Sequence, residues 1–460
     1  MNQIIVMPYP GRGHINPMLN LCHSLSSKLN QPNRTTIFTV ILTEEWLELI
    51  KQDPDHNTDN DNGNVRFVTI PNVLPSELNR GQNMSSMFEF LMAVKTKMQQ
   101  PFEDVLDDLI EFVPVKLIIA DATMTWPFYV ANNRNIPVAA YSPMSAMMFS
   151  VLHHVDLIES HNQLYADVSE RGSEPIDYIP GISSLTIADV PMLLHEGIGQ
   201  KLKGVVNDTV DVAKKADYVL LSTIYELESK VIDALRARLQ IPVYTSGPNI
   251  PYSRTKPHSS PNEPLYLTWL DSKPSTSVLY VSLGSYLSVS GDEIDEIAYG
   301  LVQSGANFLW VARGETSRLK ELCAEKGMVV EWCDQLKVLS HCSIGGFWTH
   351  CGWNSVKESL FSGVPMLTFP IIIDQPLNSK AIVEDWKIGL NMKKEVGAFK
   401  RDEIAKVVRR FMDSESVERI EMMERSKGVQ KVCRESVVES GSVTKDLDEF
   451  LRAMATNESK

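Results

Sequence analysis

The chain has 460 residues, too many for one hydrophobic core, and this length indicates two domains of roughly 200 residues each. It carries 44 Lys and Arg against 58 Asp and Glu, a net charge of −14 that would repel nucleic acid and anionic membranes. The sequence has no run of about 18 apolar residues, and its first residues lack the basic segment of a signal peptide. We therefore expect a cytoplasmic protein with no nucleic-acid partner and no integral membrane segment.

The six cysteines show no CxxC spacing, which favours a reducing compartment over a disulfide scaffold. Two His–Cys pairs, at 341–342 and 350–351, raise the question of zinc. Adjacent ligands without a second CxxC pair match known zinc sites poorly. We therefore expect no metal site.

The first half of the chain alternates strand and helix patterns. Residues 4–7 predict a buried strand, which a glycine-rich turn connects to a helix from residue 15. His14 ends this turn, at the carboxyl end of a strand, where open α/β sheets bind ligands. The turn resembles a GxGxxG dinucleotide loop, but its last glycine is replaced.

Further strands are predicted at 35–43, 65–70, 115–121 and 136–143, and the third of these ends on Asp121. The polar run between the first two contains Asp59 and Asp61, which we interpret as solvated loop and not as a metal site. Helical tracts are predicted at 85–111 and 145–161. The apolar patch FEFLM in the first tract could line an acceptor pocket or simply be core. The methionine and aromatic residues of the second tract are typical of the wall of a hydrophobic pocket.

The segment 246–264 is rich in proline and serine and predicts a linker between domains 1–245 and 265–460. The second domain begins with a strand at 277–285, whose end at Ser285 offers backbone N–H groups to a phosphate. Charged helices follow from residue 400. We expect the last of them to pack back on the first domain.

Residues 332–375 combine several groups that suit a nucleotide sugar. A buried strand at 344–350 leads into a helix whose first turn is Gly352, Trp353, Asn354 and Ser355. The free N–H groups and positive dipole end of this helix form an anion site, with His350 as a further donor.

Glu358 lies one helical turn after Asn354, and a carboxylate there suits a ribose diol. Trp332 offers a face for stacking a base, and Asp374 and Gln375 offer acceptors and donors for sugar hydroxyls. Taken singly, each has an ordinary alternative: a core tryptophan, a solvated glutamate or a helix cap.

Together, HCGWNS, the glutamate, GVP and DQ at these separations resemble the signature box of the plant family 1 UDP-glycosyltransferases. The resemblance spans nearly the whole chain. It implies the α/β GT-B fold, in which two doubly wound Rossmann-like domains face a cleft. The donor then belongs to the C-terminal domain and the acceptor to the N-terminal domain.

By this resemblance His14 is the general base and Asp121 its partner. It further implies that Trp332 and Gln335 hold uracil and that Glu358 holds the ribose, while Trp353, Asp374 and Gln375 contact the sugar. A glutamine at the last position goes with glucose in relatives, so UDP-glucose is the expected co-substrate, with no cofactor. The expected donor-binding set is Ser285, Trp332, Cys333, Gln335, His350, Gly352, Trp353, Asn354, Ser355, Glu358, Asp374 and Gln375.

The expected reaction is an inverting, metal-independent hexosyl transfer that forms a β-glycoside on a hydroxyl or carboxyl of a small hydrophobic acceptor. UDP-xylose and UDP-galactose remain alternative donors, and the acceptor is left open. A catalytically silent nucleotide-sugar sensor would need no base, so His14 and Asp121 argue against it. A Rossmann oxidoreductase would need an acidic residue about 20 residues after the glycine turn, and residues 28–43 contain none. The absence of heptads argues against a coiled-coil dimer, and we expect a monomer.

Overall fold

The computed structural model describes residues 2–29, 36–52, 64–77, 84–197, 199–200, 204, 206, 212, 214–251, 264–284, 291–312, 316–395 and 399–456. Ser285, the pair Asp59 and Asp61, and most of the expected linker lie outside these residues. The chain divides into two compact units, one of Met1–Ile250 with Ser436–Lys460 and one of Pro251–Glu435. Each is described by itself.

The first unit is built on a seven-stranded parallel sheet in the order β3-β2-β1-β4-β5-β8-β9. Its strands are nearly continuous apolar runs, as expected for a sheet covered on both faces. The strand order reverses between β1 and β4. The strands are β1 Asn2–Met7, β2 Thr36–Thr43, β3 Val65–Ile70, β4 Val115–Asp121, β5 Val138–Ser142, β8 Tyr218–Leu221 and β9 Val243–Thr245.

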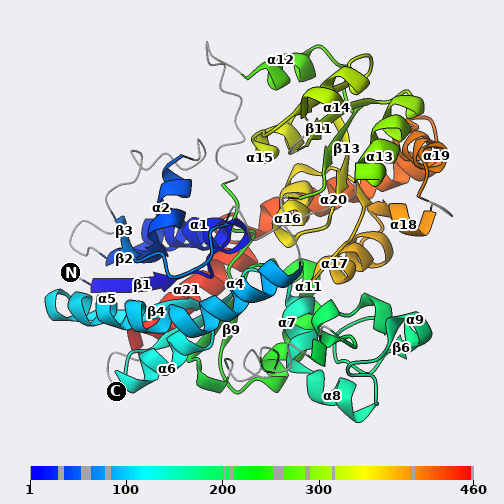
Figure 1. Cartoon of the computed structure of the whole chain (residues 1–460). Coiled ribbons are helices and arrows are strands. Elements are labelled where there is room, and N and C mark those ends of the chain that lie inside the picture. Colours follow the sequence, from blue (N-terminus) through cyan, green and yellow to red (C-terminus); the bar gives the residue numbers. More distant parts are fainter. Residues whose placement is uncertain are drawn as a thin grey trace. The chain divides into compact units, whose positions relative to one another are not determined.

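Helices flank this sheet (Figure 1), and two of the predicted tracts are divided. The tract 85–111 is two helices that meet at the buried Met98, and the tract 145–161 breaks at His154. The helices are α1 Arg12–Leu29, α2 Glu44–Lys51, α4 Met84–Lys97, α5 Gln99–Phe112, α6 Trp126–Asn133, α7 Ala146–His153, α8 Val155–Ser160, α9 Val168–Arg171, α11 Tyr225–Arg238 and α21 Ser442–Thr456. A short antiparallel pair, β6 Pro175–Ile176 and β7 Leu185–Thr186, was not predicted.

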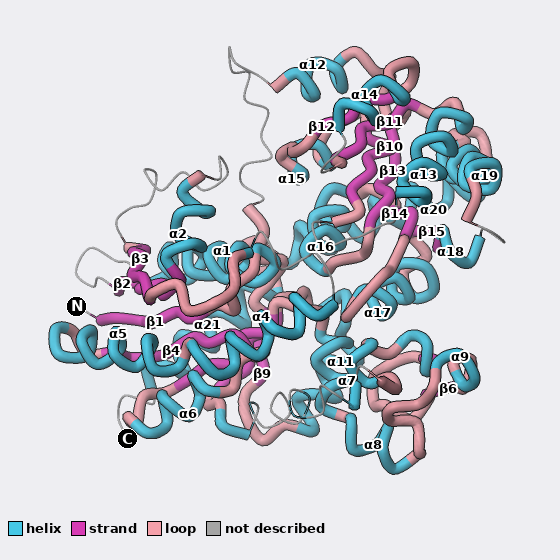
Figure 2. The backbone as a smooth tube through the Cα atoms, in the orientation of Figure 1, coloured by secondary structure: helices cyan, strands magenta, loops and turns pink. Residues whose placement is uncertain are grey.

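The second unit repeats the arrangement with a six-stranded parallel sheet in the order β12-β11-β10-β13-β14-β15. Cyan helices flank the magenta strands in Figure 2, and the core includes Phe308, Trp348 and Phe411. Here the order reverses between β10 and β13. The strands are β10 Val278–Ser282, β11 Asn307–Val311, β12 Gly327–Val330, β13 Ile344–Thr349, β14 Met366–Thr368 and β15 Gly389–Asn391.

Strand β12 ends at Val330, so Trp332 and Cys333 lie in the loop after it. Strand β14 has three residues, because the chain leaves the sheet at Phe369 and Pro370. The helices of this unit are α12 Leu265–Asp271, α13 Gly291–Ser304, α14 Thr316–Cys323, α15 Gln335–Leu339, α16 Trp353–Ser362, α17 Gln375–Lys380, α18 Met392–Glu395, α19 Arg401–Met412 and α20 Val417–Ser436.

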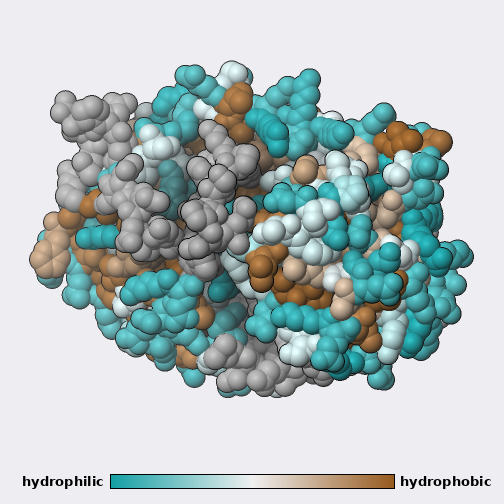
Figure 3. All heavy atoms as spheres, turned by 90° about the horizontal axis from the view of Figure 1, so that it is seen from above, coloured by the Kyte–Doolittle hydropathy of each residue, from teal (hydrophilic) through white to brown (hydrophobic). Residues whose placement is uncertain are grey.

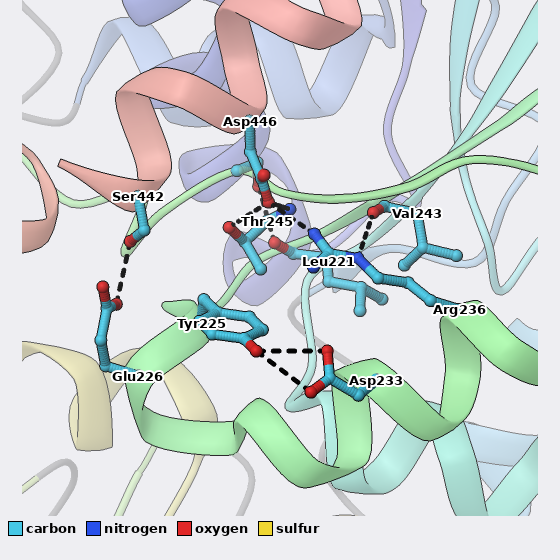
Figure 4. Close-up of polar contacts among 10 residues, drawn as sticks. Leu221, Tyr225, Glu226, Asp233, Arg236, Val243, Thr245, Ser442 and Asp446 are labelled. Atoms are coloured by element: carbon cyan, nitrogen blue, oxygen red, sulfur yellow. Dashed lines mark hydrogen bonds and ion pairs between the residues drawn. The ribbon is translucent and has the colours of Figure 1, made fainter. Parts of the chain in front are cut away.

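The last helix, α21, packs in the first unit beside β9 and α11 (Figure 4). Oδ2 of Asp446 accepts hydrogen bonds from the backbone N–H and the hydroxyl of Thr245, both at 2.7 Å, and from Arg236 Nη2 at 3.0 Å. Ser442 donates to Glu226 at 2.9 Å. The first unit is therefore completed by residues from the far end of the chain.

The surface in Figure 3 is mostly hydrophilic, with separate apolar groups between the polar ones. Among the described helices, none is both long and apolar enough to cross a membrane. The large hydrophobic side chains that are exposed include Phe88, Phe112, Trp332, Val417 and Val438. Of these, the sequence analysis offers Trp332 as a stacking face for a base, and Phe88 lies in the tract 85–111 that could line an acceptor pocket.

Candidate active site

His14 and Asp121 meet where the strand order of the first sheet reverses. Helix α1 begins at Arg12, three residues earlier than predicted, so His14 lies in its first turn. Asp121 is the last residue of β4, the strand next to β1. Nδ1 of His14 lies 2.8 Å from Oδ2 of Asp121, and the side chain of His14 is 23% exposed while that of Asp121 is fully buried.

Thr123 holds the other oxygen of this carboxylate. Oδ1 of Asp121 accepts hydrogen bonds from the Thr123 backbone N–H at 3.0 Å and from its hydroxyl at 2.6 Å. Oδ2 therefore remains directed at His14. A carboxylate accepts only from a protonated nitrogen, so in the neutral ring the proton is on Nδ1 and the free electron pair is on Nε2. This arrangement suits a general base.

Tyr9 lies beside His14, and Phe90 lies next to Tyr9. The ring of Tyr9 lies 4.9 Å from that of His14, at an interplanar angle of 43°, and Phe90 of α4 lies 6.2 Å from Tyr9. Sequence reasoning missed both Tyr9 and Thr123. Tyr9 follows the same strand as His14, and Thr123 stands two residues after Asp121, the spacing of a side-chain-to-backbone turn.

In the second unit, His350 follows β13 directly and lies between two glycines. A Cβ atom at Gly352 would lie 2.5 Å from Nε2 of His350, and one at Gly284, two residues after β10, would lie 2.9 Å from Cδ2. Gly284 also has a φ of +86°, which favours glycine. Burial lowers the pKa of His350 to about 4, so the ring is neutral at pH 7. It can therefore serve a phosphate as a hydrogen-bond donor but not as a cation.

Gly352 is the N-cap residue of α16 and has no side chain to cap the first turn. The N–H groups of a helix start are a ready anion site. Trp353 itself is buried, with its ring 6.4 Å from that of Trp386. The backbone of Trp353, together with Asn354 and Ser355, thus forms the polar part of the first turn of α16.

Gln335 joins several of the predicted donor residues. Its Nε2 donates to Ser355 Oγ at 2.9 Å and to Glu358 Oε2 at 2.6 Å. Its Oε1 accepts from the hydroxyl of Tyr280 at 3.1 Å. Gln335 begins helix α15, capped by Asp334, a short helix that the sequence did not predict.

Trp332 and Cys333 stand in the loop just before this helix. The indole of Trp332 is 42% exposed, as a stacking surface requires, whereas Cys333 is buried with Sγ 3.4 Å from the Tyr280 hydroxyl. The loop therefore leaves the tryptophan side chain accessible and turns the cysteine inward.

Asp374 and Gln375 mark the start of α17. Oε1 of Gln375 accepts from the N–H groups of Ile371 and Ile372, at 2.8 and 3.0 Å. Its amide nitrogen is then the group that can donate to a ligand. Oδ2 of Asp374 accepts from Asn378 Nδ2 at 2.8 Å. Asp374 stands at the N-cap position of α17, but its side chain makes no capping hydrogen bond to the backbone of that helix.

All six cysteines are free thiols, and within the described ranges no group of three or more His, Cys, Asp or Glu side chains could hold a metal ion.

Comparison with known proteins identifies the family. Residues 209–430 match the family described as UDP-glucoronosyl and UDP-glucosyl transferase. UDP-glycosyltransferase 87A2 of Arabidopsis thaliana is 44% identical over 453 residues, covering 98% of this chain and 96% of the relative. The structure of UGT2 from Phytolacca americana, complexed with UDP-2fluoro-glucose and pterostilbene, is 27% identical with a TM-score of 0.80, covering 99% of this chain and 100% of that one. The chain therefore belongs to the plant family 1 UDP-glycosyltransferases, transferases with the GT-B fold.

Proposed function

We propose that this enzyme transfers glucose from UDP-glucose to a hydroxyl or carboxyl group of a small hydrophobic acceptor, with inversion at the anomeric carbon. The observation that carries the proposal is the pair His14 and Asp121, at 2.8 Å, with the carboxylate fully buried. An inverting displacement needs one base for the acceptor and one site for the leaving UDP.

His14 is the proposed base. Its Nε2 takes the proton of the acceptor hydroxyl as the acceptor oxygen bonds to the anomeric carbon. The bond from that carbon to UDP breaks, and its electron pair leaves with the diphosphate. Attack from the face opposite UDP converts an α-linked donor into a β-glucoside. Asp121 stabilises the imidazolium that forms, and a carboxyl acceptor would already be ionised at pH 7 and need less help.

The leaving diphosphate is assigned to the first turn of α16, with the hydroxyl of Ser355 and the neutral imidazole of His350 as further donors. In this proposal these groups stabilise the departing charge, and no divalent metal or other cofactor is required.

Glucose is proposed because a glutamine at the position of Gln375 goes with glucose in relatives, and the polar groups at the start of α17 suit a sugar. The Gln375 amide nitrogen can donate to a sugar hydroxyl and the Asp374 carboxylate can accept from one. Relatives support this choice: the Phytolacca enzyme binds UDP-2fluoro-glucose, and 7-deoxyloganetin glucosyltransferase of Catharanthus roseus is 33% identical.

The acceptor is assigned to the first unit, with α4 and α7 as apolar walls. Helix α7 is buried along its whole length and contains Met147, Met148 and Phe149. Methionine and aromatic side chains adapt well to hydrophobic ligands. We further propose that the enzyme acts as a monomer in the cytoplasm.

The test is UDP release from UDP-glucose, with EDTA present, against a panel of phenols, terpenoid alcohols and aromatic acids, with products identified by mass. Transfer of glucose without metal supports the proposal. Transfer from UDP-xylose or UDP-galactose alone would overturn the choice of sugar. Tight UDP binding with no transfer from any of these donors to any member of the panel would favour the silent sensor.

A further inference from the structure

Asn378 is a buried residue of α17 whose side chain reaches two parts of the donor site. It is 1% exposed, and its Nδ2 donates to the backbone carbonyl of Cys351 at 2.9 Å and to Oδ2 of Asp374 at 2.8 Å. Both partners are acceptors, so the amide nitrogen and not the oxygen must face them. The orientation of this side chain is thus fixed by its surroundings.

The first partner, Cys351, lies in the turn that leads from β13 into α16. It is fully buried and has a φ of +68°, a left-handed conformation that a residue with a side chain adopts at a cost in free energy. Two hydrogen bonds hold it there. Its N–H donates to Thr349 Oγ1 at 3.1 Å, and its carbonyl accepts from Asn378. This conformation brings Gly352 to the N-cap position of the helix assigned to the diphosphate.

The second partner, Asp374, is the acidic residue assigned to the sugar. It stands four residues before Asn378, one turn of α17, and the backbone N–H of Asn378 donates to its carbonyl at 3.0 Å. The helix therefore brings both side chains to one face. One amide group thus ties the turn before α16 to this carboxylate.

We propose that Asn378 is a positioning residue of the donor site. It holds the turn before α16 and the Asp374 carboxylate in the relative positions that let the diphosphate and the sugar of a UDP-sugar bind at once. The proposal rests on the proposed function in assigning Asp374 to the sugar. A residue with this role should affect a UDP-sugar more strongly than UDP, because UDP does not need Asp374.

The test is calorimetric titration of the full chain with UDP and with UDP-glucose. Asn378→Ala should weaken UDP-glucose binding about 10-fold and UDP binding about 3-fold or less, as expected for lost buried hydrogen bonds. Asn378→Asp keeps the volume of the side chain but cannot donate as a carboxylate, so it should act in the same direction and serves if the alanine variant fails to fold.

Ser359→Ala is the matched control. Ser359 is fully buried in α16, and its hydroxyl donates to the carbonyl of Val364 at 2.8 Å, a hydrogen bond in which none of the assigned donor residues takes part. This variant should lower the melting temperature and leave the ratio of UDP-glucose to UDP affinity unchanged. An equal change of the ratio in Ser359→Ala and Asn378→Ala would reduce the role of Asn378 to general stability and overturn the proposal.

Asp374→Ala completes a double-mutant cycle. If Asn378 acts on the sugar through Asp374, adding Asn378→Ala to Asp374→Ala should not lower the ratio further. The proposal would be overturned if Asn378→Ala lowered the affinity ratio in the Asp374→Ala background as much as it does in the wild-type background. It would also be overturned if the Asn378 single variants left the ratio unchanged. If the wild type prefers another UDP-sugar, the choice of glucose fails, and the same ratio measured with that sugar still decides the role of Asn378.

Discussion

Nδ1 of His14 lies 2.8 Å from Oδ2 of Asp121, although 107 residues separate them in the chain. The parallel sheet explains this distance, because β1 and β4 are neighbours and their carboxyl ends reach the same edge. The relationship makes the role of each oxygen of Asp121 testable.

Asp121→Asn should lower turnover by about 100-fold or more while UDP affinity stays near the wild-type value. The amide nitrogen or oxygen that replaces Oδ2 no longer provides a negative charge for the imidazolium. Steady-state rates and UDP titration measure the two quantities. A variant with wild-type turnover would remove Asp121 from the mechanism.

Thr123→Val should lower turnover about 3- to 10-fold, because it removes the 2.6 Å hydrogen bond to Asp121 Oδ1 and keeps the backbone bond. Thr123→Ser retains the hydroxyl and should recover most of the activity. Equal rates in the two variants would show that the hydroxyl does not orient the carboxylate.

Glu358→Ala should weaken UDP binding about 10-fold, since a carboxylate on a ribose diol makes charge-assisted hydrogen bonds. Turnover at saturating UDP-glucose should change less. The variant also removes the partner of Gln335 Nε2, at 2.6 Å. Normal UDP affinity combined with a lost reaction would mean that Glu358 belongs to the catalytic residues.

His153→Phe should make the enzyme less sensitive to acid. His153 is buried, its ring stacks on Phe149 at 4.0 Å, and burial lowers its pKa to about 4. Between pH 6.5 and 4 the unfolded chain binds a proton at this residue and the folded chain does not, so wild-type stability falls as the pH falls.

In the His153→Phe variant, the free energy of unfolding should fall less steeply as the pH falls, by up to about 1.4 kcal/mol per pH unit. Urea unfolding at several pH values between 7 and 4.5 measures it. The variant also loses the hydrogen bond to the Phe149 carbonyl, a change that is independent of pH in this range. An unaltered slope would show that His153 is protonated in the folded state as readily as in the unfolded one.

Asp446→Ala should destabilise the first unit by about 2 kcal/mol, because three donors converge on its Oδ2 (Figure 4). Asp448→Ala, on the same helix, removes a half-buried pair with Lys28 and should cost less than about 1 kcal/mol, because water still screens this pair. Thermal unfolding distinguishes them. Equal losses would mean that α21 is held by its apolar face, including Phe450, and not by Asp446.

The alternation of strands and helices predicted the first sheet, and apolar runs predicted strands at 277–285 and 344–350 of the second, because buried parallel strands are continuous apolar runs. The three-residue strands β9 and β15 were missed, since they become strands only through pairing with β8 and β14. The early start of α1 was also missed. Gly11, Arg12 and Gly13 form a poor helix sequence, so tertiary packing must set this start.

In the candidate site, likewise, relations within one helix could be predicted from the sequence and contacts between elements could not. The spacing of Asn354 and Glu358 within one helix was readable, because helical geometry fixes it. The contacts of Gln335 with Glu358 and of Asn378 with Cys351 join residues 23 and 27 positions apart in different elements. Such contacts depend on how the elements pack, and no local sequence pattern predicts them.

The most direct test of the account is His14→Ala, assayed for glucose transfer and, in parallel, for UDP affinity. If His14 is the base, turnover falls by about 100-fold or more and UDP affinity stays nearly unchanged. A variant that still transfers glucose at the wild-type rate would contradict the proposed mechanism at its centre.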